Sequence, residues 1–243
     1  MFTILPFETE FYKKHDYKVN YVGNPLLDAI LEKKTKPDYP RFFAENKLAD
    51  KPILALLPGS RKGEISVLLP TMLEAASYFP EYQCVIAGAP NMGVEYYQPF
   101  MKLHDAPIVW GKTYELLVHS CVAIVSSGTA TLETAILNVP QVVVYQLKPK
   151  WLFDFLMFFF LKAKWVSLVN IILEKEAVAE VVQSKFTLKN VVAELKKILH
   201  DPENEKRMLA DYREMMIKLG EPGASKRAAG LMVSKIKNSK PKV

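Results

Sequence analysis

The stretch that decides the fold of this chain is Ser126-Ser127-Gly128-Thr129-Ala130-Thr131-Leu132-Glu133. It directly follows an apolar run of strand-forming residues at 121–125 and leads into a helical pattern that ends near Asn138. A strand, a turn of small residues and a helix start in this order form an anion site. The N–H groups of the turn and of the first helical turn converge there, and the helix dipole favours negative charge. The stretch therefore predicts a phosphate site at the end of a strand.

Four residues of this stretch suit a nucleotide. Gly128 lets the backbone approach a phosphate closely, and Ser127 and Thr129 carry hydroxyl donors. Glu133 lies one helical turn beyond Thr129 on the same face, where its carboxylate can accept hydrogen bonds from sugar hydroxyls. The combination predicts a nucleoside diphosphate with its ribose on Glu133. The alternative is an ordinary helix start with a surface glutamate.

Two more turns of the same kind follow apolar runs earlier in the chain. One carries Gly59, Ser60 and Arg61, and the other begins at Gly88. In an open parallel sheet, ligands bind in the crevice beyond the carboxyl ends of the strands, so the three turns should meet. Arg61 is the one arginine in these turns, and a guanidinium is well suited to a diphosphate. We therefore expect Gly59, Ser60, Arg61 and Gly88 to bind substrate together with the first stretch.

The order of predicted elements indicates the fold class. From residue 52 onward, strands alternate with helices. We predict strands at 53–57, 82–87, 107–109, 121–125 and 141–145, and helices at 64–78, 93–103, 113–120, 129–138, 150–161, 187–199, 203–219 and 223–238. Alternation of this kind predicts an α/β fold, a Rossmann-like parallel sheet with helices on both faces, plus C-terminal helices. Residues 31–51, rich in Lys, Pro and Asp, are expected to form a connector.

Composition narrows the classes of partner and cofactor. The chain has a net charge of +6 and is 50% hydrophobic. The charge is compatible with nucleic acid or an anionic membrane, but no nucleic-acid recognition motif is present, so we expect no nucleic acid. Cys84 and Cys121 lie in apolar runs and are predicted to be buried, reduced thiols of a cytosolic protein. Scattered histidines and the lack of an Asp-x-Asp pair predict no metal, and we expect no other cofactor.

The most hydrophobic run, residues 151–161, has lysines on both sides: Lys148, Lys150, Lys162 and Lys164. As a helix it would be about 16 Å long, far short of the ~30 Å hydrocarbon core, so it cannot span a bilayer. Two alternatives remain open. The run is buried in the core or in a homodimer interface, or it lies at an anionic membrane surface with Trp151 and Trp165 at headgroup depth. We call residues 151–165 the aromatic belt.

Taken together, the segments resemble the lipid-A-disaccharide synthase family, bacterial glycosyltransferases of GT-B architecture. The resemblance covers nearly the whole chain and is carried by residues 5–8, 21–25, 57–61, 64, 127–133, 166–172 and 180–183. Two positions depart from the family pattern. Asn24 stands where the family usually has His, and Val169 stands where it has Pro. The second change leaves Asn170 available.

The resemblance implies a domain organisation and an activity. GT-B enzymes have two Rossmann-like domains, and this chain is similar to the C-terminal, donor-binding half. Residues 1–50 would be a remnant of a missing N-terminal acceptor domain and the crossover from it, 51–200 the UDP-sugar domain, and 201–243 C-terminal helices and a basic tail. The family transfers 2,3-diacylglucosamine from its UDP donor to 2,3-diacylglucosamine 1-phosphate with inversion, which gives a β-1,6 disaccharide and UDP. The implied location is the cytoplasm, peripherally on the inner membrane.

The resemblance also implies roles for single residues. Arg61 would stabilise the leaving UDP, while the general base is expected in the missing N-terminal half. Asn170 would contact phosphate or sugar. Gln183 and Glu180 are weaker candidates, equally compatible with a capped surface helix.

Two other functions fit the same motifs. One is a different UDP-sugar enzyme of GT-B architecture, such as a peptidoglycan N-acetylglucosaminyltransferase or a UDP-N-acetylglucosamine 2-epimerase. An epimerase should have carboxylates in the cleft and lack the aromatic belt. The other is an isolated, non-catalytic module that binds a nucleotide sugar and docks on a membrane.

Overall fold

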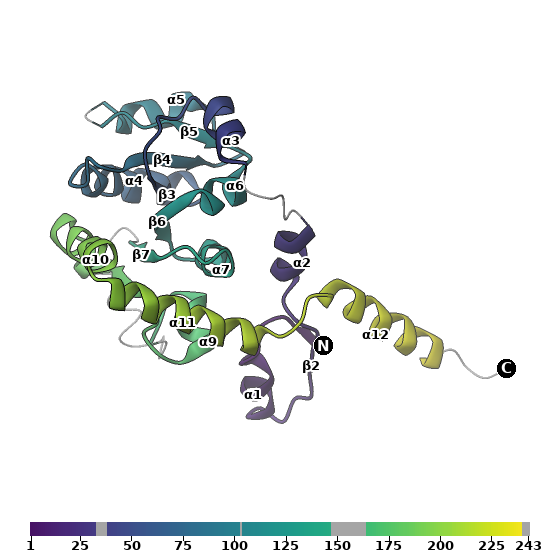
Figure 1. The fold of residues 1–243 in the computed structure, drawn as a ribbon. Coiled ribbons are helices and arrows are strands. Elements are labelled where there is room, and N and C mark those ends of the chain that lie inside the picture. The colour runs from purple at the N-terminus through teal and green to yellow at the C-terminus, as the bar shows by residue number, and fades with distance from the viewer. Residues whose placement is uncertain (33–37, 103, 147–163, 240–243) are drawn as a thin grey trace. The chain divides into compact units, whose positions relative to one another are not determined.

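The computed structural model describes residues 1–32, 38–102, 104–146 and 164–239 (Figure 1). They form two compact units, Lys36–Tyr212 and Met1–Thr35 with Arg213–Val243. The boundary falls inside helix α11 (Pro202–Leu219). The division into domains at 1–50, 51–200 and 201–243 stays a prediction.

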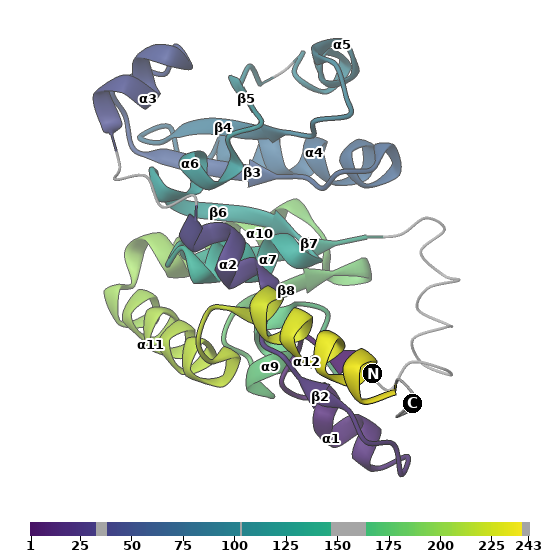
Figure 2. The same ribbon diagram turned by 90° about the vertical axis from the view of Figure 1, so that its right-hand side faces the viewer.

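The larger unit is built on a six-stranded, wholly parallel sheet, which confirms the predicted fold class (Figure 1, Figure 2). The strand order is β5-β4-β3-β6-β7-β8. The bounds are β3 (Ile53–Leu57), β4 (Gln83–Gly88), β5 (Ile108–Trp110), β6 (Ser120–Ser126), β7 (Gln141–Tyr145) and β8 (Ala179–Val182). Strand order reverses between β3 and β6, and a reversal of this kind opens a crevice at the carboxyl ends of the two strands.

Helices cover both faces of the sheet. On one face α4 (Lys62–Ala76) packs beside α10 (Leu188–His200), and on the other α6 (Thr113–Val118) and α7 (Thr129–Ile136) pack against β6 (Figure 1). The described part of this unit also contains the short helices α3 (Tyr39–Glu45), α5 (Val94–Tyr97) and α9 (Leu168–Leu173), and the 3-10 turns η1 (Gln98–Phe100) and η2 (Gln183–Lys185). The predicted helix at 150–161 lies outside the described residues.

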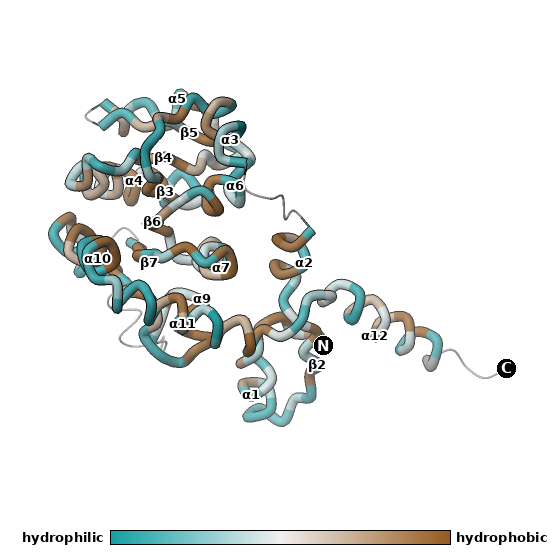
Figure 3. Tube along the Cα trace, viewed as in Figure 1, coloured by the Kyte–Doolittle hydropathy of each residue, from teal (hydrophilic) through white to brown (hydrophobic). Residues whose placement is uncertain are grey.

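The hydrophobic core lies on both faces of the sheet, under the helices that cover them. Every residue of β3 is buried, as expected for a parallel strand between two helical layers. The strand is hydrophobic throughout and is drawn brown in Figure 3. Phe42 of α3 is 2% exposed and joins the same hydrophobic cluster as Ile53 and Leu116. The expectation that residues 31–51 form only a connector is therefore wrong for α3. The aromatic side chain of Phe42 packs into the core although the segment around it is polar.

The two cysteines differ in exposure. Burial raises the pKa of the Cys84 thiol to about 12. Cys121 is exposed, so the prediction that it is buried is wrong. It is the second residue of β6, before the strand enters the layer between the helices. Both cysteines are free thiols.

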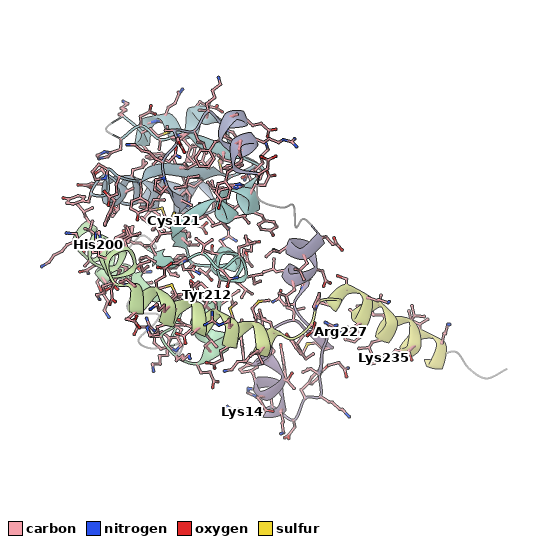
Figure 4. The ribbon with its side chains drawn as sticks, viewed as in Figure 1. Lys14, Cys121, His200, Tyr212, Arg227 and Lys235 are labelled. Atoms are coloured by element: carbon pink, nitrogen blue, oxygen red, sulfur yellow. The ribbon has the colours of Figure 1, made fainter. Side chains whose placement is uncertain are left out.

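The smaller unit contains a two-stranded parallel sheet, β1 (Phe2–Thr3) and β2 (Asn20–Tyr21), with helices α1 (Glu8–Lys13), α2 (Pro25–Glu32) and α12 (Ala224–Ser239). The carboxylate of Asp28 accepts the backbone N–H groups of Gly223 and Ser225, and so caps α12 from α2. The guanidinium of Arg227 donates to the carbonyl of Val22 at 2.8 Å (Figure 4). These contacts fix the start of α12 on α2.

Candidate functional site

A cleft of about 470 Å³ opens at the carboxyl ends of β3, β4 and β6. It lies at the point where strand order reverses, as expected for an open parallel sheet. Eight of the residues predicted to bind substrate line it: Gly59, Ser60, Arg61, Gly88, Ser127, Gly128, Thr129 and Glu133. The structure thus brings three turns distant in sequence to one place, while their contact with a ligand stays a prediction.

The turn between β6 and α7 presents backbone donors to this cleft. Gly128 is the N-cap of α7 and has φ of +139°, a conformation that favours glycine. No side chain of the described residues caps this helix. The hydroxyl of Ser127 donates to the carbonyl of Val166 at 2.7 Å and is thereby held by the protein. The N–H groups at the start of α7 and the hydroxyl of Thr129 remain the groups best placed for an anion.

The turn between β3 and α4 supplies charge. Arg61 is the N-cap of α4, and its side chain is 82% exposed. Its guanidinium lies 2.9 Å from the carboxylate of Glu64, which also accepts the N–H of Ser60 at 3.3 Å. Gly59 has φ of +100°, and a side chain there would collide with Glu64. The N-terminus of α4 therefore already holds a carboxylate, in the position where the helix dipole favours one.

Glu133 has a partner that the sequence did not reveal. The phenol of Tyr114, from α6, donates to Oε1 of Glu133 at 3.0 Å. Burial raises the pKa of Glu133, and the hydrogen bond from Tyr114 opposes that shift. Burial and the neighbouring carboxylate raise the pKa of Tyr114 to about 12, so the phenol keeps its proton at neutral pH. One sequence feature could have indicated a place for Tyr114 in the site: like the three predicted turns, it follows the end of a strand, here β5.

Gly88 has a packing role as well as a place in the cleft. A Cβ at Gly88 would overlap the ring of Trp110, which stands on the neighbouring strand β5. The ring of Trp110 also meets that of Tyr97 edge-on, with centroids 5.5 Å apart. The absence of a side chain at Gly88 thus lets an aromatic pair close the end of β4.

Asn170 is buried and does not line the cleft. Its amide donates to the carbonyl of Val178 and to the carboxylate of Glu180, and it accepts the N–H groups of Ala177 and Val178, all at 2.8–3.0 Å. These bonds close the turn between α9 and β8. The geometry gives Asn170 a structural role and does not support the predicted contact with phosphate or sugar.

Glu180 and Gln183 also lie outside the cleft lining. The carboxylate of Glu180 accepts the N–H groups of Val166 and Ser167, the two residues just before α9, at 2.9 Å each. The side chain of Ser167 caps α9 itself by accepting the N–H of Asn170 at 3.2 Å. Gln183 is 5% exposed at the end of β8, and its carbonyl accepts a hydrogen bond from Gln146. Neither residue belongs to a capped surface helix. Glu180 holds the chain just before α9 to β8, and Gln183 begins the 3-10 turn η2 that follows β8.

The described residues were expected to hold no metal ion and bear also on membrane insertion. Within them, no group of three or more His, Cys, Asp and Glu side chains is arranged to hold a metal ion. None of the described helices is long and apolar enough to cross a bilayer.

Solved structures define the class of fold. The chain superposes on UDP-GlcNAc 2-epimerase from Neisseria meningitidis, solved with UDP-GlcNAc, with a TM-score of 0.65 and 17% identity, over 95% of this chain and 61% of that one. It superposes on the calicheamicin glycosyltransferase CalG4 with a TM-score of 0.58 and 15% identity, over 98% of this chain and 54% of that one. The fold is that of the GT-B glycosyltransferases and epimerases.

Sequence comparison defines the family within that class. A family model described as lipid-A-disaccharide synthetase matches residues 1–235, and the chain belongs to this family. The lipid-A-disaccharide synthases of Syntrophus aciditrophicus and Myxococcus xanthus are 35% and 36% identical to it, over 98% and 94% of the chain. The chain spans 63% and 60% of the lengths of these two relatives.

Proposed function

We propose that this chain binds the UDP-linked acylated glucosamine donor in a lipid-A-disaccharide synthase reaction. The observation that carries the proposal is the gathering of eight predicted substrate residues around one cleft, in a chain of this family. The reaction moves 2,3-diacylglucosamine from UDP to 2,3-diacylglucosamine 1-phosphate and leaves UDP and a β-1,6 disaccharide. Residues 51–200 form the donor-binding domain in this proposal.

The cleft residues have separate tasks in this reaction. Negative charge develops on the diphosphate as the sugar departs, and electrostatic stabilisation there lowers the barrier. Arg61 releases Glu64 to bind the diphosphate, the N–H groups at the start of α7 hold the same group, and Glu133 accepts the ribose hydroxyls. Inversion needs a base for the acceptor hydroxyl. We assign that base, with the acceptor site, to the part of the family's length that this chain does not span.

Titration with UDP and with uridine, in the presence of a chelator, tests the donor site. Arg61→Ala should weaken UDP binding by roughly 10- to 150-fold, because a hydrogen bond to a charged group contributes about 1.5–3 kcal/mol. Uridine affinity should change little. Arg41→Ala is the matched control, because Arg41 is exposed and paired with Glu45 on the same helix, away from the cleft. Equal losses for UDP and uridine would place Arg61 away from the diphosphate, and loss of UDP binding in chelator would reject a metal-free site.

The alternatives predict different activities. An epimerase would convert UDP-N-acetylglucosamine without an acylated acceptor, and the family match favours the synthase over it. A non-catalytic module would bind UDP and remain inactive when it is mixed with the N-terminal part of a synthase. Disaccharide formation by that mixture, with none from either part alone, supports the synthase.

We also propose that the aromatic belt attaches the protein peripherally to the cytoplasmic side of an anionic inner membrane. Both substrates carry acyl chains, so the enzyme has to meet them at a bilayer. Lysines near an anionic surface contribute about 1 kcal/mol each. Among the described residues of this region, the ammonium of Lys164 lies 4.8 Å from the ring centroid of Trp165.

Vesicle flotation distinguishes membrane attachment from burial of the belt. Replacing Lys148, Lys150, Lys162 and Lys164 with Gln should abolish binding to anionic vesicles and leave UDP affinity intact. If the unmodified chain ignores such vesicles at low salt, the belt belongs to the core or to a homodimer interface. Sedimentation then separates these two outcomes by the mass of the particle.

A further inference from the structure

The contact between Tyr114 and Glu133 joins two neighbouring helices at the wall of the cleft. Gly111, with φ of +68°, turns the chain from β5 into α6. The first residue of α6, Thr113, lines the cleft, and the second, Tyr114, donates its phenol proton to Glu133. Within the described part of the chain, Tyr114 is the one group that hydrogen-bonds to this carboxylate.

We propose that Tyr114 is a positioning residue that orients the carboxylate of Glu133 toward the ribose hydroxyls of the nucleotide. The inference rests on the proposed donor site. The phenol occupies Oε1 of Glu133, and because Glu133 lines the cleft, its other oxygen, Oε2, is left as an acceptor for a ligand. A glutamate held by one donor loses less side-chain freedom when a second donor arrives, which strengthens the second bond.

The ionisation of Glu133 gives this role a measurable signature. A sugar hydroxyl donates more strongly to a carboxylate than to a neutral acid. Burial raises the pKa of Glu133, and the Tyr114 phenol opposes that shift, so removal of the phenol should raise the pKa further. The other charged groups that line the cleft are Arg61 and Glu64, which pair with each other. Tyr145, at the end of β7, is electrostatically coupled to that pair.

The experiment compares UDP with 2′,3′-dideoxyuridine diphosphate, and the affinity ratio of the two isolates the ribose hydroxyls. Tyr114→Phe should weaken UDP binding about fivefold and leave the dideoxy compound unchanged. As the pH is lowered, the preference for UDP over the dideoxy compound should disappear at a higher pH in this variant than in the unmodified chain. Because both ligands carry the same diphosphate, its own titration cancels in the ratio.

Tyr212→Phe is the matched control. The phenol of Tyr212 is buried and donates to the carbonyl of Val139, outside the cleft. This variant should lower the thermal stability and leave both the ratio and its pH profile unchanged. A purely structural Tyr114 would behave in the same way.

Four results would overturn the inference. If Tyr114→Phe weakens both ligands equally, or leaves the ratio and its pH profile unchanged, Tyr114 does not position Glu133. Should that variant fail to fold, Glu133→Gln provides the second test, since it should abolish both the preference for UDP and the pH dependence. A preference that persists in Glu133→Gln removes Glu133 from the ribose. Absence of UDP binding by the unmodified chain would overturn the proposed donor site as well.

Discussion

Helices α7 and α9 begin side by side, but their N-termini are satisfied in opposite ways. Ser127, just before α7, donates its hydroxyl to the carbonyl of Val166, just before α9. The start of α9 is closed twice: the side chain of Ser167 accepts the N–H of Asn170, and the carboxylate of Glu180 accepts the N–H groups of Val166 and Ser167 at 2.9 Å each. The start of α7 has no side-chain cap among the described residues and faces the cleft.

The two helices show that a helix N-terminus can be closed by the protein itself in one place and stay open to a ligand in another. A helix N-terminus attracts an anion because its first N–H groups lack partners and its dipole is positive there. At α9 the protein supplies the anion, and at α7 the position is open to a phosphate. Helix α4 is intermediate, because Glu64 occupies its N-terminus while the partner of Glu64, Arg61, is exposed and is the residue that we propose binds the diphosphate.

The largest effect is expected at the closed terminus. Glu180→Ala removes the acceptor from the N–H groups of Val166 and Ser167 and from the amide of Asn170. Unsatisfied buried donors cost about 1–3 kcal/mol each, and partial access of water reduces the sum. We expect the free energy of unfolding to fall by about 3 kcal/mol, measured by urea denaturation.

Glu203→Ala is the control for the loss of a glutamate, because Glu203 forms an exposed pair with Lys206. Such pairs contribute about 0–1 kcal/mol. If Glu180→Ala costs no more than this control, the carboxylate does not close α9, and the contrast between the two termini disappears.

A smaller loss of stability is expected at the open N-terminus of α7. There the loss comes from backbone strain and not from broken hydrogen bonds. No atom lies within 4 Å of a Cβ built on Gly128, so Gly128→Ala meets no clash. Its φ of +139° is nevertheless unfavourable for alanine, and we expect a loss of about 1–3 kcal/mol in stability together with weaker UDP binding.

Gly63→Ala should change the stability in the opposite direction. Gly63 lies in helix α4, and the space that an alanine methyl group would fill there is open, so alanine should stabilise the helix by roughly 0.5–1 kcal/mol. Thermal unfolding of the two variants measures the difference. Equal behaviour would mean that the backbone at Gly128 relaxes and that the open terminus needs no glycine.

The contrast also separates what the sequence could predict from what it could not. The strands and turns of the cleft follow from local patterns, because apolar runs end in small residues at each strand end. Strand β8 was missed because it has four residues and includes Glu180, so it shows no long apolar run. The roles of Asn170 and Glu180 depend on partners up to 14 residues away, which local spacing does not indicate. Tyr114 was missed for the same reason, since its partner stands on another helix.

The smallest effect is expected for Glu64→Gln. This variant tests the N-terminus of α4, which is intermediate between those of α7 and α9. In the open cleft the Glu64 carboxylate binds the guanidinium of Arg61 and the N–H of Ser60. A diphosphate has to displace this carboxylate or accept its repulsion. Because Arg61 is 82% exposed, the pair itself contributes only about 0–1 kcal/mol, so its loss should cost little stability. The amide should therefore tighten UDP binding, by about threefold at low salt, and the gain should shrink as added salt screens the charges.

Titration calorimetry at two salt concentrations measures both effects, with uridine as the ligand that should not respond. Weaker UDP binding in Glu64→Gln would mean that Glu64 positions Arg61 instead of competing for it, and α4 would then be a closed terminus like α9.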